Sequence, residues 1–305
     1  MIERVCVVGA GVIGGLLAGH LAQVCEVTVL TRRREHADAL NREGLRVSGK
    51  SVRTARVLAA TDPEALPSPD VAIVATKATG LREALEALAG SFPDATMTTV
   101  LNGLGAEEIV REHGEWPIVS AVTFMSGTRH SDTHVEYILD TETWLGPYEE
   151  TPFDHVQEIA DTIVASGLRA EALPDLRPAQ WSKLIFNAAV NPVAALTGLP
   201  HDAHFAAEDE ATDLGHVVRG LVDEGKAVAE AAGIELHDDP WEMNVLATQR
   251  GSAHYPSMLE DVDAHRETEI ELITGSLVRE AHRHGVPVPL HTVLYELVKA
   301  KQASW

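Results

Sequence analysis

A glycine-rich motif near the amino terminus does most to limit what this chain can fold into. Gly9, Gly11 and Gly14 form G-x-G-x-x-G between the β-branched run 5–8 and an Ala- and Leu-rich helical stretch. In a βαβ unit, these glycines permit a tight turn, close approach of a pyrophosphate, and close packing of helix on strand. Packing alone also selects such glycines, but the position favours a dinucleotide site. The residues expected to bind the cofactor here are Gly9, Gly11, Val12, Ile13 and Gly14.

Strand-like and helix-like segments alternate after this motif. The apolar run Val71–Thr76 is typical of a buried parallel strand, and strand-like pieces between 117 and 147 are expected to close the far edge of the sheet. Other strands are expected at 26–30, 45–47, 55–58 and 98–101, and helices at 35–41 and 81–89. The alternation predicts an N-terminal Rossmann-type, doubly wound sheet, over residues 1–174.

The pattern becomes wholly helical beyond Pro174 and Pro178. Apolar periodicity predicts helices at 178–197, 207–232, 240–250, 258–284 and 290–302. The fold class is therefore α/β, with a doubly wound domain followed by an all-helical C-terminal domain at 175–305. The apolar content of this half would permit a homodimer, but no pattern requires one.

The charge of −22 at pH 7 excludes several kinds of partner. It is spread over both halves of the chain, so we expect no nucleic acid and no anionic membrane as a partner. The uncharged run 5–25 resembles a membrane span, but its five glycines and His20 favour a strand, turn and helix. Cys6 and Cys25 are too few for a secreted disulfide framework, so we expect a cytoplasmic protein.

The end of the second strand carries information about the cofactor. NAD enzymes usually have an acid there for the ribose 2′-OH, whereas this strand runs into Thr31 and three arginines, with no acid before Glu35. Guanidinium groups bind a 2′-phosphate bidentately. A solvated charge run is the alternative, although cations are disfavoured at a helix N-terminus. We predict NADP(H), with Arg32 as the first candidate ligand.

Two polar residues follow buried strands at the edge where open α/β sheets bind ligands. Lys77 comes directly after Val71–Thr76 and is one of only six lysines, although a surface lysine opening a loop is an equal alternative. Asn102 follows the next strand, but Asn-Gly is also a common turn pair.

A stronger candidate site lies on the helix expected at 178–197. Lys183, Asn187 and Asn191 are spaced i, i+4, i+8, so they share one face of a helix that is apolar nearly all round. A buried structural network is the alternative. If the face lines a ligand cavity, burial lowers the lysine pKa and lets Lys183 donate a proton to a developing alkoxide.

The segment after residue 256 holds further polar residues. Ser257 is expected to cap a helix, with Glu260 completing a capping box. Asp261, His265 and Glu269 repeat the i, i+4, i+8 spacing, but without a second ligand cluster we expect no metal. Glu269 precedes apolar residues, which suggests that it reaches inward.

Taken together, GAGVIG, TKA, LNG, WSKLIFNAAVNPVAALTG and SMLEDVDAHRETEI resemble the ketopantoate reductase (2-dehydropantoate 2-reductase) family over nearly the whole chain. The family has a Rossmann domain and a helical domain like that of 6-phosphogluconate dehydrogenase, with NADPH and substrate between them. The resemblance implies hydride transfer to the ketone of a 2-oxo acid, by default ketopantoate, with Lys183 as general acid and Glu269 and Asn102 as catalytic partners. It also places Lys77 and Asn102 beside the nicotinamide. The implied substrate-binding residues are Lys183, Asn187, Asn191, Ser257 and Glu269.

Two departures from the family pattern concern the substrate. His201 and His254 stand where the family often has asparagines. The sequence therefore supports the reaction class better than the substrate. A reductase of another 2-oxo acid or of an imine is one alternative, and a non-catalytic NADP-binding sensor is another.

Overall fold

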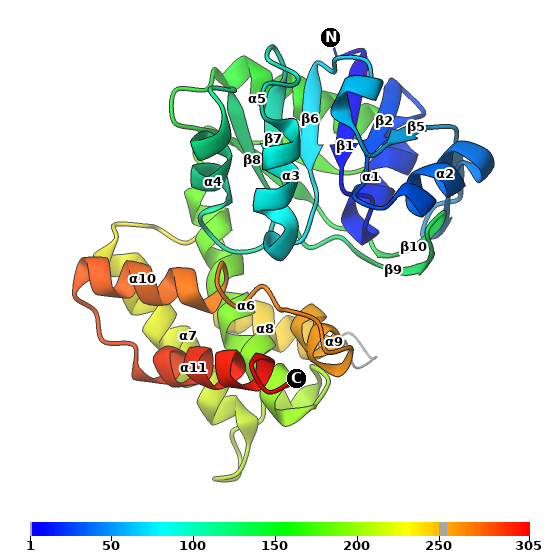
Figure 1. Cartoon of the computed structure of the whole chain (residues 1–305). Coiled ribbons are helices and arrows are strands. Elements are labelled where there is room, and N and C mark those ends of the chain that lie inside the picture. Colours follow the sequence, from blue (N-terminus) through cyan, green and yellow to red (C-terminus); the bar gives the residue numbers. More distant parts are fainter. Residues whose placement is uncertain (1, 250–254) are drawn as a thin grey trace. The chain divides into compact units, whose positions relative to one another are not determined.

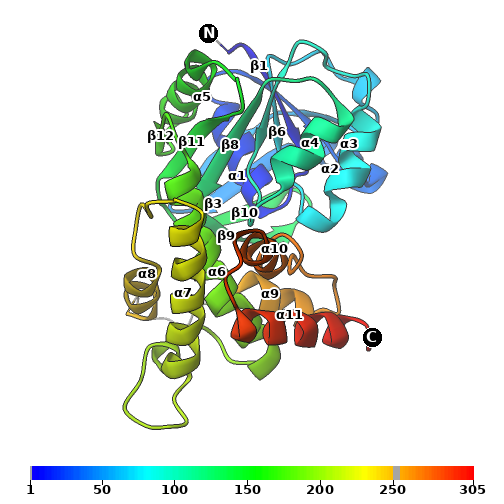
Figure 2. The same cartoon turned by 90° about the vertical axis from the view of Figure 1, so that its left-hand side faces the viewer.

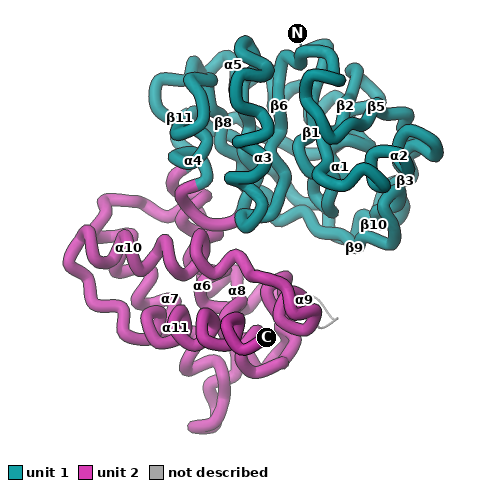
Figure 3. Tube along the Cα trace, viewed as in Figure 1, with its two compact units in different colours: residues 1–101, 106–176 teal, residues 102–105, 177–305 magenta. Residues whose placement is uncertain are grey.

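The computed structural model describes residues 2–249 and 255–305. The chain forms two compact units (Figure 3). Unit 1 comprises residues 1–101 and 106–176, and unit 2 comprises residues 102–105 and 177–305. The short segment Asn102–Gly105 therefore belongs with the helical part of the chain, although it lies within the α/β part of the sequence.

Unit 1 is built on an eight-stranded sheet with the order β12-β11-β8-β7-β6-β1-β2-β5 (Figure 1). The neighbours pair in parallel, except β11 and β8, which are antiparallel. The predicted doubly wound sheet is confirmed. Its strands are β1 (Arg4–Val8), β2 (Glu26–Leu30), β5 (Leu58–Ala60), β6 (Val71–Val74), β7 (Thr96–Thr99), β8 (Ile118–Thr123), β11 (Thr143–Tyr148) and β12 (Ala170–Ala172).

Helices cover both faces of this sheet. Figure 2 shows α3 (Leu81–Leu88) and α4 (Ala106–His113) on one face and α5 (Phe153–Ala165) on the other. The sequence pattern had not indicated α4 or α5, although α5 buries Val156, Ile159, Ala160 and Ile163 at helical spacing. The remaining helices of unit 1 are α1 (Val12–Leu21), α2 (Arg34–Glu43) and two short 3₁₀ turns, Pro63–Ala65 and Ala78–Gly80.

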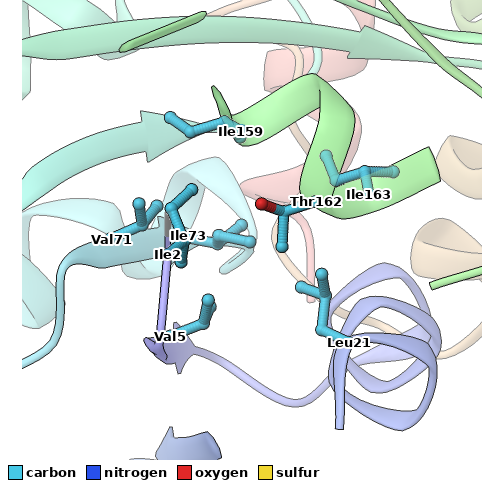
Figure 4. Close-up of a pocket in the computed structure, with 8 residues that line it drawn as sticks. All are labelled: Ile2, Val5, Leu21, Val71, Ile73, Ile159, Thr162 and Ile163. Carbon is cyan, nitrogen blue, oxygen red and sulfur yellow. The ribbon is translucent and has the colours of Figure 1, made fainter. Parts of the chain in front are cut away.

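A small cavity lies where α1 and α5 pack on the sheet (Figure 4). Its volume is about 10 Å³, and seven of its eight lining side chains are aliphatic, Thr162 being the other. A space this small and apolar holds at most one water molecule. It is a gap in the core and carries no binding function.

Part of the expectation for residues 117–147 is wrong. β8 and β11 do extend the far edge of the main sheet, but β9 (Ser126–Ser131) and β10 (His134–Leu139) do not. They form a second sheet, β4-β3-β10-β9, with β3 (Leu45–Gly49) and β4 (Arg53–Ala55). A local sequence pattern can mark a strand, but it does not say which partner the strand takes.

Unit 2 packs its helices around α6 (Arg177–Thr197), which is buried along most of its length. Its core joins Leu184, Ile185 and Ala188 of α6 to apolar residues of the surrounding helices. These helices are α7 (Leu214–Ala231), α8 (Pro240–Thr248), α9 (Ser257–Asp263), α10 (Thr274–His284) and α11 (Pro289–Gln302), with a 3₁₀ turn at Ala203–Phe205. The predicted all-helical domain is confirmed.

The prediction of one continuous helix over 258–284 is wrong. α9 ends at Asp263, and the chain does not become helical again until Thr274. His265 takes a left-handed backbone conformation, with φ of 49°, which ends a right-handed helix. We refer to residues 264–273 as the 264–273 loop. The helix expected from 207 also begins later, at Leu214.

Within residues 2–249 and 255–305, no helix has the length and apolar character needed to cross a bilayer.

Candidate active site

The glycine turn of unit 1 has the geometry that the motif predicts. Gly9 has φ of 93°, and a Cβ on it would lie 2.9 Å from Thr76 Cγ2. A Cβ on Gly14 would lie 2.0 Å from the carbonyl oxygen of Gly9. Both glycines are thus required by the protein's own packing.

Gly11 differs from these two. A Cβ on Gly11 would meet no atom within 4 Å, and φ is an ordinary −74°. Packing therefore does not demand a glycine there, whereas a ligand that approaches the backbone closely would. The open space at Gly11 suits a pyrophosphate.

The surroundings of this space also suit an anion. α1 begins at Val12 and has no acidic residue in its first turn, so the N–H groups of its N-terminal end and their partial positive charge are not opposed. The turn follows β1 beside β6, where the strand order reverses. Ligands of open α/β sheets bind at this point.

Two of the three arginines after β2, Arg32 and Arg33, already have protein partners. Arg32 is exposed and donates to Glu83 at 3.2 Å, with 73% of its side chain accessible. Arg33 precedes the first turn of α2 and pairs with Asp132, which also accepts a hydrogen bond from Arg129. Arg34 opens α2 and is exposed. Arg32 lies nearest the end of β2 and is more accessible than Arg33, of whose side chain 48% is exposed. An exposed pair such as Arg32–Glu83 is weak enough to exchange for a phosphate.

Lys77 lies directly after β6 and precedes the 3₁₀ turn Ala78–Gly80. Its side chain is exposed, and its neighbour Thr76 touches the glycine turn. This placement agrees with the prediction that Lys77 follows a buried strand at the edge of the sheet where ligands bind.

In unit 2, the polar face of α6 is formed as expected. Lys183, Asn187 and Asn191 lie within one continuous helix, and Asn191 is only 6% exposed. Burial lowers the pKa of the Lys183 ammonium to about 8, while the carboxylate of Glu269 acts in the opposite direction. An amine with this pKa carries a proton at neutral pH and releases it readily.

Glu269 lies in the 264–273 loop and is nearly buried, with 9% of its surface exposed. Asn102 Nδ2 donates a hydrogen bond to Glu269 Oε2 at 3.0 Å, across 167 positions of sequence. Gly103 makes this approach possible, since a Cβ there would lie 1.8 Å from the carbonyl oxygen of Leu272. Unit 2 thus brings Asn102 and Lys183 together around one carboxylate. We call Asn102, Lys183 and Glu269 the polar triad.

The predictions for Ser257, Asp261 and His265 need correction. Ser257 is not a helix cap, because Pro256 holds that position and no side chain caps the helix. Ser257 is instead an exposed residue in the first turn of α9. Asp261, His265 and Glu269 do not share a helical face, because the helix ends between them. Asp261 is buried and accepts from Arg266 Nε at 2.9 Å, and His265 stacks on Trp305.

A cluster that the sequence did not suggest surrounds His201. The imidazole is 2% exposed, shares a hydrogen bond of 2.8 Å with Asn244 Oδ1, and meets Phe186 and Phe205 edge to face. His254, the other departure from the family pattern, lies outside the described residues. Among the described residues, no group of three or more His, Cys, Asp or Glu is arranged to hold a metal.

Comparison with known proteins covers both units. Residues 5–150 match the family model described as "Ketopantoate reductase PanE/ApbA", and residues 175–302 match the one described as "Ketopantoate reductase PanE/ApbA C terminal". A 2-dehydropantoate 2-reductase of Pyrococcus horikoshii is 30% identical over 98% of each chain, and one of Halobacterium salinarum is 29% identical over 98% of this chain and 99% of the relative.

Solved structures share the fold. A PanE/ApbA family ketopantoate reductase from Ralstonia eutropha JMP134 superposes with a TM-score of 0.88 at 26% identity, over 99% of both chains. D-mandelate dehydrogenase, in a ternary structure with NADH and anilino(oxo)acetate, reaches a TM-score of 0.90 at 24% identity, also over 99% of both chains. The second likeness concerns the fold alone.

Proposed function

This chain belongs to the ketopantoate reductase family, and we propose that it reduces ketopantoate to pantoate with NADPH as the hydride donor. It is an oxidoreductase that acts on the CH–OH group of its product, and its cofactor is a nicotinamide dinucleotide. The product is a precursor in pantothenate biosynthesis. NADPH is a cytoplasmic reductant, and the cytoplasm is the compartment that we propose for the enzyme.

The polar triad is the observation that carries the proposal. Reduction of a ketone needs a hydride at carbon and a proton at oxygen. Lys183 has a pKa lowered to about 8 by burial, and the neighbouring Glu269 favours its charged form. Glu269 is in turn held by Asn102. A proton donor is therefore positioned beside a carboxylate and an amide, all within one unit.

Each residue has a separate task in the proposed mechanism. When bound, a nicotinamide cofactor would supply the hydride that C2 of the 2-oxo acid accepts. Lys183 Nζ donates a hydrogen bond to the ketone oxygen and then transfers its proton to the alkoxide, leaving a neutral amine. Glu269 orients the substrate and holds Lys183 protonated before the transfer. Asn102 fixes the carboxylate of Glu269 in the direction that both tasks need.

The substrate's remaining polar groups need donors. We propose that Asn187 and Asn191, one and two turns beyond Lys183 on α6, bind its carboxylate and hydroxyl groups, with Ser257 contributing from the first turn of α9. Amides and a hydroxyl both donate and accept, so they bind a carboxylate and an alcohol equally well.

For the cofactor, we propose NADP(H) rather than NAD(H). The pyrophosphate would lie on the N–H groups at the start of α1, since the Gly9 N–H already donates to the Leu30 carbonyl at 2.9 Å, and Arg32 would bind the 2′-phosphate in place of Glu83. Lys77, at the carboxyl end of β6, would lie near the nicotinamide half of the cofactor.

A spectrophotometric assay tests the function. NADPH oxidation is followed with ketopantoate and a panel of other 2-oxo acids, and repeated with NADH. We expect kcat/KM on ketopantoate of at least about 10⁴ M⁻¹s⁻¹, the ordinary range for a natural substrate. NADPH binding without turnover of any 2-oxo acid or imine would instead indicate a cofactor-binding sensor.

A reductase of a different 2-oxo acid is the second candidate, and His201 favours it. Phe186, which the imidazole of His201 meets edge to face, lies between Lys183 and Asn187 on α6. The imidazole of His201, enclosed by phenyl rings, makes this part of unit 2 more apolar than the asparagine often found at this position in the family would. Higher kcat/KM on an aryl or branched 2-oxo acid than on ketopantoate would support this candidate.

A further inference from the structure

Glu269 depends on other parts of unit 2 for its position. It lies in the 264–273 loop, between the end of α9 and the start of α10, where a backbone hydrogen bond, from Ile273 N to the Glu269 carbonyl at 3.1 Å, continues toward α10. A carboxylate that must face a particular amine and amide needs its backbone held on both sides. Beyond the backbone hydrogen bonds Ile273 N–Glu269 O and Leu104 N–Leu272 O, the structure adds side-chain contacts from α11 on both sides of Glu269.

The first hold is on Thr268, the residue before Glu269. Gln302 Oε1, at the last position of α11, accepts a hydrogen bond from Thr268 N at 2.8 Å and a second from the Thr268 hydroxyl. Thr268 is 2% exposed. One amide oxygen thus binds both the backbone and the side chain next to the carboxylate.

The second hold is on Glu271, two residues after Glu269. Its carboxylate accepts a hydrogen bond from Tyr295 Oη at 2.8 Å and pairs with Lys299, both on α11. Tyr295, Lys299 and Gln302 follow one another at intervals of four and three residues, so they lie along one face of the helix. This face of α11 runs beside the loop and binds it on each side of Glu269.

α11 is itself fixed at its other end. Glu224 of α7 accepts hydrogen bonds from the backbone N–H groups of Leu290 and His291, at 2.9 and 3.0 Å, and pairs with His291 Nδ1 at 2.9 Å. Val298, in the following turns, is fully buried. The helix therefore has the rigidity that a scaffold requires.

We propose that Gln302 is a positioning residue for the reaction, which acts through Thr268 to aim the carboxylate of Glu269 at Lys183. It does not touch substrate or cofactor. The inference rests on the proposed function, in which Glu269 serves Lys183, and extends it to the C-terminal helix.

A positioning role for Gln302 predicts a change in the pH profile of kcat/KM, which a merely stabilising role for Gln302 does not predict. The charge of Glu269 raises the pKa of Lys183 above the value that burial alone would give. If Glu269 turns away, the pKa of Lys183 falls, and the pH above which kcat/KM declines moves to lower pH. A substitution that only loosens the fold lowers the melting temperature and leaves this pH unchanged.

The experiment compares Gln302→Met, Gln302→Glu and Ser304→Ala. Methionine keeps the shape of glutamine and loses the acceptor, whereas glutamate keeps an oxygen that can accept both bonds. Ser304 is exposed and bonds only to the nearby Lys301 carbonyl among the contacts described, so it controls for changes at this end of the chain. Thr268→Val serves if Gln302→Met fails to fold, because it removes the hydroxyl bond to Gln302 and the longer one from Ile270 N at 3.3 Å, and keeps the backbone bond to Gln302.

With Gln302→Met we expect kcat to fall about 10-fold with KM changed less than about 3-fold, as for a misaligned catalytic group. The decline of kcat/KM should also move to lower pH. Gln302→Glu should restore kcat to within about 3-fold. The extra negative charge that Gln302→Glu introduces favours protonated Lys183, so it opposes any shift of the decline in kcat/KM to lower pH. Ser304→Ala should match the wild type in both measurements.

Labelling of Lys183 gives a readout that does not need turnover. Its reactivity toward an amine-directed reagent, read by peptide mass spectrometry as a function of pH, should shift to lower pH in Gln302→Met only. Such a shift in a protein that does not reduce ketopantoate would overturn the proposed function and leave the positioning role intact. The positioning role would be overturned if Gln302→Met kept the wild-type kcat, pH profile and labelling. If Gln302→Met does not fold, the same result in Thr268→Val would overturn it.

Discussion

The two units build their candidate sites in different ways. In unit 1, the proposed cofactor site is made of backbone, from residues 9–14 of one turn and the helix that follows. In unit 2, the polar triad is made of side chains from three segments, with Asn102 and Glu269 separated by 167 positions. We infer that unit 1 contributes binding and that unit 2 contributes the proton chemistry. Substitutions in the two units should then separate these two quantities.

The largest effect is expected from Lys183→Ala. Loss of a general acid costs about 10²–10⁴-fold in kcat, and we expect the upper part of this range because no other amine of the polar triad can replace it. The Kd for NADPH should change by less than about 2-fold, since the glycine turn is untouched. Fluorescence titration and initial rates measure both. Lys301→Ala is the control, and loss of NADPH binding in Lys183→Ala would break the division between the units.

Glu269→Gln should have the next largest effect. The amide keeps the size of the side chain and removes the charge that orients the substrate and favours protonated Lys183. We expect kcat to fall by about 10²-fold, the cost of one lost electrostatic partner in a buried site. Stopped-flow measurement of NADPH oxidation tests it. An unchanged kcat would remove Glu269 from the mechanism.

Two glycine substitutions sharpen the account of unit 1. Gly14→Ala places a Cβ 2.0 Å from a backbone oxygen, so we expect the free energy of unfolding to fall by about 2 kcal/mol or more. Gly11→Ala meets no protein atom, so stability should hold while the Kd for NADPH rises at least about 10-fold, because the methyl group occupies the pyrophosphate's space. Chemical denaturation and NADPH titration distinguish them. Normal NADPH affinity in Gly11→Ala would refute the placement of the pyrophosphate.

Arg32→Ala should have the smallest effect. Loss of a charge-assisted contact to the 2′-phosphate should weaken NADPH by about 10-fold and leave NADH nearly unchanged. The exposed pair with Glu83 adds little to stability, so the melting temperature should hold. Arg82→Ala, which removes another exposed arginine paired with a glutamate, is the matched control. Equal losses for NADPH and NADH would refute the role of Arg32.

The same difference between the units explains which parts of the two candidate sites could be predicted from the sequence. The glycine turn is a local motif, so its fold could be predicted from spacing, although Gly9 also packs against the distant Thr76. The environment of Glu269 is specified by distant residues. The sequence around Glu269 has a helical pattern, yet in the structure this segment forms a loop. Hydrogen bonds from α11 bind the loop at Thr268 and Glu271.

Asn102 gives a second example of a tertiary constraint. In sequence, Asn102-Gly103 is indistinguishable from an ordinary turn. In the structure, Gly103 allows the carbonyl of Leu272 to approach, and this approach brings the Asn102 amide to Glu269. No periodicity connects two segments so far apart, so the contact could not be predicted from local pattern.

The pH dependence of kcat/KM for ketopantoate reduction is the most direct test of Lys183 as the proton donor. A general acid works only while protonated, and burial lowers the pKa of Lys183 to about 8. With saturating NADPH, kcat/KM should be level near neutral pH and should fall tenfold per pH unit above about 8. A value that stays level up to about pH 10, where an ordinary lysine loses its proton, would contradict this role.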